Sequence, residues 1–202
     1  MAFEDVKKVW MTRRLVDFAD AKVHVFTHAL HYGSGVFEGI RCYKTARGPE
    51  VFRLDEHLDR LFWSAKMYRM EIPWTMEQLK AATLETIRAN GFEACYIRPL
   101  AYRGFGMLGV NPFPNPVDVM IGCYPWGKYL GPEAMEKGVD VCCSSWTRLG
   151  ANTMPAMAKS TANYANSQLI KMEAIVNGYE EGIGLGDGGR VSEGSGENLF
   201  VV

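Results

Sequence analysis

The sequence predicts a mixed α/β protein of the α+β class, and three observations support this prediction. Strand-patterned and helix-patterned runs both occur along the 202 residues, but without strict β-α-β alternation. Hydrophobic residues make up 48% of the chain and charged residues 22%, as in an ordinary globular domain. This length can bury a substantial core, either in one large domain or in two small ones.

The first third of the chain predicts two short strands and a helix. Val23–His28 and Val36–Tyr43 have strand patterns on either side of a glycine-rich turn. Asp55 is a favourable N-cap for the helix that follows. Apolar residues then recur at helical spacing: Leu58, Leu61, Phe62 and Ala65.

The middle third predicts a second helix and two longer strands. Thr75 and Gln78 have the spacing of a capping box, and Gly91 ends the helix. Pro99 indicates that the first strand is an edge strand or contains a bulge. The two strands and the loop between them are Cys95–Tyr102, Val117–Tyr124 and Gly104–Pro116.

Residues 126–138 are rich in glycine and charged residues after Pro125, and we expect an interdomain linker there. It would join a small N-terminal α/β domain, residues 1–125, to a second domain that begins at residue 139. Beyond it we expect a strand, a helix, a hairpin turn and a final strand: Val139–Ser145, Asn163–Val176, Asp187–Gly188 and Glu197–Val202. An apolar strand at the last residue would expose a sheet edge. We therefore expect 139–202 to be the start of a larger, incomplete domain in a longer protein.

Composition excludes several classes of partner. The net charge is −1 and the basic residues are scattered, which argues against nucleic acid and anionic membranes. No run approaches the eighteen apolar residues of a membrane span. Five cysteines without any C-x-x-C spacing indicate reduced thiols in a cytoplasmic protein. Cys142 and Cys143 are adjacent, and we expect both to be small core residues on opposite faces of a strand.

Several familiar motifs are absent or occur in the wrong context. Gly184–Gly189 satisfies G-x-G-x-x-G, but a glycine-broken segment follows it, so a hairpin turn is favoured over a dinucleotide site. No P-loop and no G-x-S-x-G elbow is present. The four histidines lack the H-E-x-x-H context, so we expect no metal site.

Lys159 lies in a loop of small residues ahead of a helix-patterned segment. It could be a solvated surface charge, as most lysines are. It could also be a Schiff-base lysine, because an amine whose pKa is lowered by burial attacks carbonyls readily. Tyr164, Glu193 and Glu197 follow it and favour the second interpretation, since together these residues look like parts of a pyridoxal-phosphate site.

Arginine and aromatic residues allow two interpretations each. Arg60 lies opposite the apolar stripe of its helix, so the pattern alone indicates a solvated charge. Tyr96 and Arg98 are two apart in a strand and share a face, where they could present a phenol and a guanidinium to an anion. A plain salt bridge is the alternative for Arg98. Four aromatic residues could simply belong to the core: Tyr32, Phe37, Trp126 and Tyr129.

Four motifs resemble those of the branched-chain amino-acid aminotransferases, in the family's order and spacing. They are His28–Tyr43, Tyr96–Leu100, Ala158-Lys159 with Tyr164, and Val191–Phe200, and they cover nearly the whole chain. The resemblance implies the fold of the fold-type IV enzymes and pyridoxal 5′-phosphate as cofactor. The glycine-rich segment before Val191 departs from the family's usual acidic turn.

The resemblance also implies roles around the cofactor. Lys159 would hold it as a Schiff base and move the proton at the substrate Cα. Glu193 would keep the pyridine nitrogen protonated, and Tyr164 would bond the ring oxygen. Arg60 would reach the phosphate instead of being a solvated charge. The family places further phosphate contacts in the segment that would follow Val202.

On the substrate side the resemblance implies an apolar pocket that also accepts glutamate. The pocket would take leucine, isoleucine and valine, because an apolar slot discriminates methylene groups only weakly. Arg98 would anchor the distal carboxylate of glutamate. The loop Gly104–Pro116 would reach into the partner's pocket, which implies a homodimer or a higher assembly of dimers. The residues at the substrate positions are Tyr32, Phe37, Arg41, Tyr96, Arg98, Val110, Trp126 and Tyr129.

The implied reaction moves the amino group of a branched-chain L-amino acid to 2-oxoglutarate, giving a branched 2-oxo acid and L-glutamate. Two alternatives share the fold: a D-amino-acid aminotransferase and an aminodeoxychorismate lyase. A third is a truncated chain that folds without turning over substrate.

Overall fold

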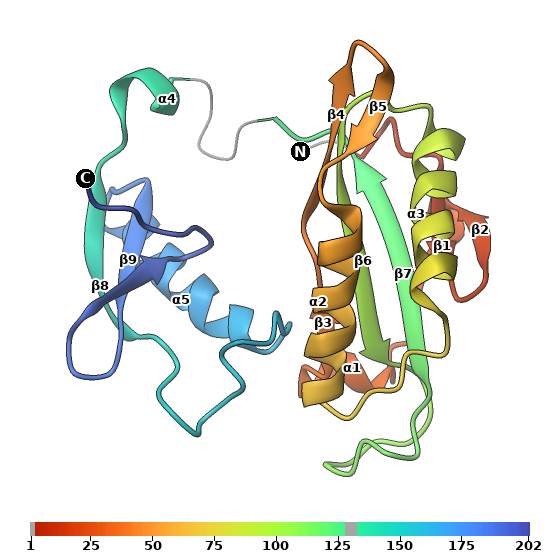
Figure 1. Cartoon of the computed structure of the whole chain (residues 1–202). Coiled ribbons are helices and arrows are strands. Elements are labelled where there is room, and N and C mark those ends of the chain that lie inside the picture. Colours follow the sequence, from red (N-terminus) through yellow and green to blue (C-terminus); the bar gives the residue numbers. More distant parts are fainter. Residues whose placement is uncertain (1–2, 128–132) are drawn as a thin grey trace. The chain divides into compact units, whose positions relative to one another are not determined.

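The computed structural model describes residues 3–127 and 133–202, and its contacts divide the chain into two compact units (Figure 1). Unit 1 comprises Met1–Trp126 with Met157–Ala162, and unit 2 comprises Gly127–Ala156 with Asn163–Val202. The predicted site residue Tyr129 lies outside the described residues. The fold is mixed α+β, with helices and sheets in both units.

Unit 1 is built on an antiparallel sheet of seven strands in the order β2-β1-β7-β6-β4-β5, with β3 also paired to β6. Helices α2 and α3 cover one face of this sheet (Figure 1). The strands are β1 (Lys8–Met11), β2 (Arg14–Asp17), β3 (Gly35–Phe37), β4 (Ile40–Thr45), β5 (Gly48–Val51), β6 (Cys95–Arg103) and β7 (Val117–Tyr124). The helices are the 3-10 turn η1 (Phe18–Asp20), α1 (His28–Tyr32), α2 (Leu54–Met67) and α3 (Met76–Asn90).

The core of unit 1 forms where the predicted stripe of α2 meets the sheet. Leu58 and Leu61 are fully buried and belong to one cluster with Ile97 of β6 and Ile121 of β7. Burying a leucine or isoleucine side chain contributes about 1.5–3 kcal/mol. The alternation of β6 then decides which of its residues face away from the helices.

The two helix starts differ in how well the sequence predicted them. The capping box of α3 is confirmed: the Thr75 hydroxyl accepts from the Gln78 N–H at 3.2 Å, and the Gln78 side chain accepts from the Thr75 N–H at 2.8 Å. Asp55 is not the N-cap of α2, because the helix begins at Leu54 after Arg53 in a left-handed conformation. Asp55 instead pairs with Lys80 of α3 at 2.6 Å.

Val23–His28 is not a strand, which corrects the sequence prediction. A turn closes there, with the Thr27 N–H donating to the His24 carbonyl at 2.9 Å, and α1 begins at His28. The valines of this segment, Val23 and Val25, are exposed, so the alternating pattern has no sheet to pack against. The second predicted strand exists but is divided into β3 and β4 at Glu38 and Gly39.

Pro99 lies in the interior of the sheet, so the expected edge strand or bulge is wrong. β6 pairs with β7 in continuous register on one side and with β3 and β4 on the other. Pro99 faces the break between β3 and β4, where its carbonyl accepts from the Glu38 N–H at 3.0 Å. Its missing N–H therefore costs no ladder bond.

Unit 2 contains a three-stranded sheet in the order β10-β9-β8 and one long helix. β8 and β9 are parallel and are connected through α5, while β9 and β10 form a hairpin. Gly188 and Gly189 have positive φ angles in its turn, which confirms the predicted hairpin. The elements are α4 (Ala134–Lys137), β8 (Val141–Thr147), α5 (Asn163–Val176), β9 (Glu181–Leu185) and β10 (Val191–Gly194).

Three expectations for the last third differ from the structure. No strand covers Glu197–Val202, since β10 ends at Gly194 and the side chains of the last residues are exposed. Cys143 is exposed rather than a core residue, because α5 covers the face of β8 that carries Ser144. The segment Met157–Ala162, expected in the second domain, packs with unit 1. It does so through a bridge between Ser160 and Val36 of β3. The expected boundaries at 126–138 stay a prediction.

Candidate functional site

Lys159 is held in unit 1 by its own backbone. Its N–H donates to the Ser64 hydroxyl of α2 at 3.2 Å, and its carbonyl accepts from the Phe37 N–H at 2.9 Å. The side chain is half-buried, and its Nζ lies 5.2 Å from the centre of the Phe37 ring. These two bonds fix the backbone of Lys159 on both sides of its Cα, and the side chain is less exposed than that of a typical surface lysine.

Arg98 and Tyr96 share one face of β6, as the sequence predicted. Cys95 and Ile97 point into the core beneath α2 and α3. Side chains alternate along a strand, so those of Tyr96 and Arg98 point to the opposite face. The Arg98 guanidinium donates to the Tyr96 phenol at 2.7 Å through Nη2 and lies 4.3 Å from the centre of the Phe37 ring. In the described part of the chain no carboxylate pairs with Arg98, so the alternative of a salt bridge is wrong.

Arg41 and Trp126 complete this cluster. Arg41 of β4 is the register partner of Tyr96, so both side chains lie on the same side of the sheet. Arg41 Nη1 donates to the Trp126 carbonyl at 2.6 Å, and the Tyr96 and Trp126 rings are 4.6 Å apart. Burial raises the pKa of the neighbouring Tyr124 phenol to about 12, although Arg98 and Arg41 lower it. Its phenol is therefore neutral at pH 7.

Five of the eight predicted substrate residues therefore lie in one group beside Lys159: Phe37, Arg41, Tyr96, Arg98 and Trp126. Tyr32 and Val110 lie elsewhere in unit 1. Tyr32 stacks on His28 at the end of α1, with ring centres 4.6 Å apart. Val110 is 88% exposed in the loop between β6 and β7.

The Arg60 side chain is 51% exposed, as its helical position suggests, but it is also tied to a buried partner. Its Nε and Nη2 donate to the two oxygens of Glu38 at 2.6 Å each. Glu38 is fully buried and also bonds His57 Nδ1 at 2.9 Å. Glu38, His57 and Ser64 support the site and were not predicted from the sequence. A signal was present, because His57, Arg60 and Ser64 are spaced three and four apart on one helix face.

Unit 2 carries the other two predicted cofactor residues. Tyr164 lies in the first turn of α5, and Glu193 lies on β10. Arg148 pairs with Glu193 Oε1, at 2.6 Å from Nη2 and 2.9 Å from Nε, and Arg148 is itself held by Asn166 and Ser167 of α5. These contacts leave Glu193 Oε2 without a hydrogen bond among the described residues. Arg148 was not among the residues predicted from the sequence.

Glu197 belongs to a different cluster of unit 2. Burial and the neighbouring Glu181 raise the pKa of the Glu197 carboxyl above its ordinary value. Glu181 is buried and pairs with Lys171 at 3.0 Å. Glu197 therefore supports the fold of this segment rather than lying with Glu193.

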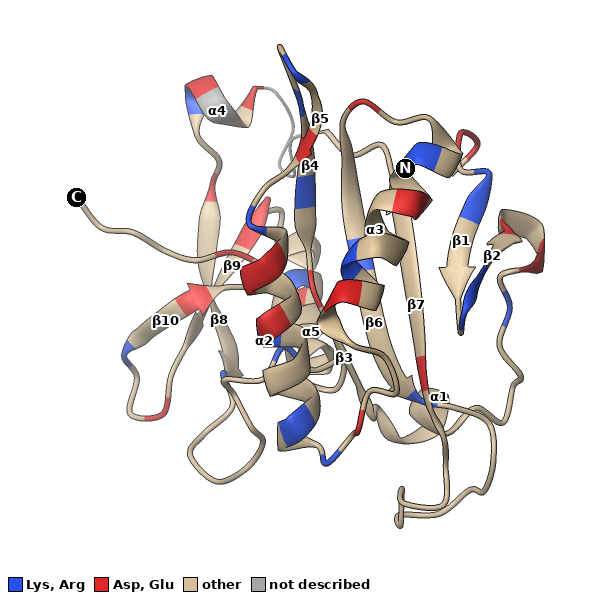
Figure 2. Cartoon of the chain, turned by 45° about the vertical axis from the view of Figure 1, so that its right-hand side comes forward, with Lys and Arg blue, Asp and Glu red and all other residues tan. Residues whose placement is uncertain are grey.

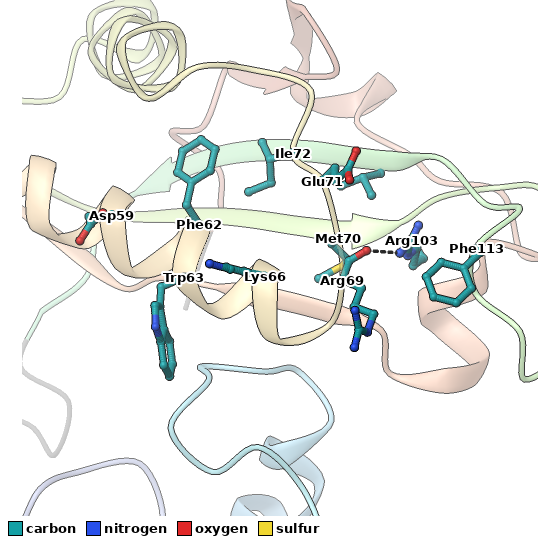
Figure 3. Close-up of a pocket in the computed structure, with 11 residues that line it drawn as sticks. Asp59, Phe62, Trp63, Lys66, Arg69, Met70, Glu71, Ile72, Arg103 and Phe113 are labelled. Carbon is teal, nitrogen blue, oxygen red and sulfur yellow. Dashed lines mark hydrogen bonds between the residues drawn. The ribbon is translucent and has the colours of Figure 1, made fainter.

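A pocket of about 1130 Å³ in unit 1 is lined by none of the predicted site residues (Figure 3). Its most buried cation is Arg103, whose guanidinium donates to the carbonyls of Arg69 at 2.7 Å and Asn115 at 3.1 Å. Lys66 and Arg69 on its wall are accompanied by Asp59 and Glu71. We therefore assign the site to the Lys159 group and not to this pocket.

Charges of both signs are interspersed along the elements of each unit (Figure 2). Within the described residues, none of the helices has both the length and the apolar character needed to cross a membrane. The charges that distinguish the site are therefore single side chains and one ion pair. They are Lys159 and Arg98 in unit 1, and the Arg148–Glu193 pair in unit 2.

Comparison with known proteins shows which family this chain resembles. The chain is 49% identical over 195 residues to the branched-chain-amino-acid aminotransferase of Escherichia coli K12, covering 96% of this chain and 63% of that protein. The crystal structure of the Escherichia coli branched-chain amino acid aminotransferase superposes with a TM-score of 0.95 at 48% identity, over 98% of this chain and 65% of that one. The crystal structure of the T.th. branched-chain amino acid aminotransferase with pyridoxamine 5′-phosphate gives a TM-score of 0.93 at 52% identity, with the same two coverages.

These relatives are longer, and the chain spans about 63% of the length of the curated protein it matches. The family described as amino-transferase class IV matches residues 35–202, which include every predicted cofactor residue. The match covers most of the chain, and the chain therefore belongs to the class IV aminotransferases.

Proposed function

We propose that the protein containing this chain is a transaminase that moves the amino group of leucine, isoleucine or valine to 2-oxoglutarate. The observation that carries the proposal is the group around Lys159. The amine of Lys159, whose backbone is held on both sides, lies beside the Phe37 ring. The guanidinium of Arg98 lies near the same ring and has no carboxylate partner among the described residues. Such a wall suits both an apolar side chain and a second carboxylate.

The residues present fit pyridoxal 5′-phosphate as cofactor. When bound, this group supplies a carbonyl that condenses with amines and a ring that draws charge from the substrate Cα. Glu193 is suited to the pyridine nitrogen because Arg148 holds one carboxylate oxygen while the other has no partner in the described residues. Arg60 would bind the phosphate, with Glu38 setting its orientation, and Tyr164 would bond the ring oxygen.

Lys159 performs the proton transfer in this proposal. Its amine would take the proton from the substrate Cα as a base and would then give up a proton as an acid. The two backbone bonds to Ser64 and Phe37 limit the positions that the Cα of Lys159 can adopt. Such orientation is one of the larger contributions that a protein makes to catalysis.

Two classes of substrate would share the wall of Phe37, Tyr96 and Trp126. The rings offer apolar surface to a branched side chain. Arg98, braced by the Tyr96 phenol, would bind the distal carboxylate of glutamate or 2-oxoglutarate. The cation near a ring face is stabilised by the aromatic system, which keeps it in place when no anion is bound.

We also propose a homodimer or a higher assembly of dimers, in the cytoplasm. Tyr96 and Arg103 are separated by seven residues of β6, or roughly 23 Å at about 3.3 Å per residue. Val110 follows Arg103 in the loop at that far end of the strand. Tyr32 and Val110 would therefore serve the site of a partner subunit.

Mixed dimers test this assembly. Lys159→Ala and a double change of Tyr32 and Val110 to alanine should each give a weakly active or inactive homodimer. Refolding the two together should restore one native site in the mixed dimer. Mixtures that stay at the average of the two parents would contradict the shared site.

The central test is a screen of amino donors on the holoenzyme. Leucine, isoleucine and valine should be converted with 2-oxoglutarate, and Lys159→Ala should lose both turnover and the visible absorption that appears when the cofactor is added. Preferred turnover of D-alanine would favour a D-amino-acid aminotransferase, and pyruvate release from 4-amino-4-deoxychorismate would favour the lyase.

A further inference from the structure

His28 is a buried histidine for which the proposed reaction has no role. It is the first residue of α1 and is 1% exposed. Its Nε2 lies 2.9 Å from the Gly109 carbonyl oxygen, and its Nδ1 lies 2.8 Å from the Ser34 hydroxyl. A carbonyl can only accept, so Nε2 carries a proton, and in the neutral imidazole Nδ1 accepts from the Ser34 hydroxyl.

The Gly109 carbonyl belongs to the peptide unit that also contains the Val110 nitrogen. The bond from His28 therefore holds the peptide immediately before Val110. Gly109 has a φ of 137°, a conformation that side chains other than glycine rarely adopt. The loop thus turns sharply at the point where His28 holds it, which presents Val110 outward.

The same imidazole holds Tyr32. The two rings are stacked, with centres 4.6 Å apart and planes at 30°. Tyr32 and Val110 are the two predicted substrate residues that lie away from the Lys159 group. One buried side chain therefore contacts one of them directly and fixes the backbone of the other.

The rest of the loop is braced only near its two ends. Gly104 donates to the Pro116 carbonyl at 2.8 Å, and Met107 donates to the Asn115 side chain at 2.7 Å. Among the described residues, one hydrogen bond joins residues 108–111 to another element of unit 1. It is the bond between His28 and the Gly109 carbonyl. The position of Val110 depends on that bond.

We propose that His28 is a positioning residue for substrate specificity, which holds Tyr32 and Val110 where they contact the apolar side chain of the amino donor. The inference rests on the proposed transaminase function. His28 touches neither the reacting atoms nor the cofactor in this arrangement. It acts on the binding of the donor and leaves the proton transfer by Lys159 unaffected.

Two variants separate the contacts of the imidazole. In His28→Gln the amide nitrogen can occupy the place of Nε2 and donate to Gly109. His28→Asn is shorter, so its amide can reach the partner of Nδ1 but not Gly109. Both variants lose the stacking on Tyr32, which makes the glutamine variant the matched control for the loop bond.

On the holoenzyme, His28→Asn should raise the KM for leucine about five- to tenfold, the equivalent of one neutral hydrogen bond. Its kcat should stay within about twofold of the parent, and His28→Gln should recover most of the KM. An unchanged KM in the asparagine variant, or equal losses of kcat in both variants, would overturn the proposal.

Two measurements without turnover distinguish this inference from the proposed function. Nitrogen-15 shifts of the imidazole should show the neutral Nε2–H form of His28. Chymotrypsin should cleave after Leu108 faster in His28→Asn than in the parent and in His28→Gln. Equal cleavage in all three, or an Nδ1–H form, would refute the role of His28 even if transamination is observed. Absent transamination in the parent would refute the proposed function, and the cleavage rates would still decide whether His28 holds the loop.

Discussion

The pair of Glu38 and Arg60 should respond very differently to the loss of each partner. The Glu38 side chain is fully buried, whereas the Arg60 side chain is 51% exposed. Arg60→Met leaves a buried carboxylate whose remaining ionisable partner, among the residues that the structure describes, is His57. Removing one partner of a buried pair in this way costs about 3–5 kcal/mol. Glu38→Gln leaves a cation that reaches water, so we expect a loss of only about 1–2 kcal/mol from weakened hydrogen bonds.

Lys44→Met is the matched control for burial. The Lys44–Glu93 distance is 2.6 Å, as in the Arg60–Glu38 pair, but both side chains are about two-thirds exposed. An exposed pair contributes about 0–1 kcal/mol to stability. The control variant should therefore unfold close to the parent protein.

The assay is equilibrium unfolding of the apoprotein in urea, followed by tryptophan fluorescence. Four of the five tryptophans belong to unit 1, so the signal reports mainly on the unit that contains the pair. With a slope of about 2 kcal/mol per molar urea, a difference of about 2 kcal/mol separates the two midpoints by about 1 M. A loss in Glu38→Gln equal to or larger than that in Arg60→Met would refute the reasoning from burial.

Three further predictions follow from burial, charge and capping. Native protein should expose two thiols to an aromatic disulfide reagent at pH 8 and all five only after denaturation, because burial raises the pKa of the Cys42 thiol to about 11 and keeps it protonated. Three rapid thiols in the native state would contradict this. Glu197→Gln should raise the Tm at pH 7–8, because folding raises the pKa of the Glu197 carboxyl. Such a carboxyl stabilises the folded protein below its unfolded pKa. That contribution is lost as the pH rises through the folded pKa. The gain should vanish in acid, and a lower Tm at pH 8 would oppose the assignment. Thr75→Ala should cost about 1 kcal/mol in urea, while Thr75→Ser should cost little because serine keeps the cap. The thiols expected to react are Cys142 and Cys143, and the protected ones are Cys42, Cys95 and Cys123.

Local patterns predicted the elements whose causes are local. The capping box at Thr75, the stripe of α2 and the hairpin after β9 were all confirmed, since each depends on residues a few positions apart. The shared face of Tyr96 and Arg98 follows in the same way from the period of a strand.

Errors occurred where a distant segment decides the outcome. Val23–His28 has a strand pattern, but in the described part of the chain only an isolated bridge between Thr27 and Phe105 pairs it with another segment, and its valines remain exposed. Pro99 is tolerated inside the sheet only because β3 and β4 are interrupted opposite to it. Neither the missing neighbour nor the interruption can be read from the residues around these positions.

The sequence by itself determined the types of side chain available for chemistry: a lysine in a small-residue loop, a tyrosine and an arginine on one strand face, and a carboxylate at Glu193. Tertiary structure decided how they are supported. Only the packing of β3 against α2 shows that Arg60 is tied to buried Glu38 and that Ser64 and Phe37 hold the backbone of Lys159. The physical reason is range. Periodicity and capping act within a few residues, whereas a buried charge needs partners that only chain folding brings within hydrogen-bond distance.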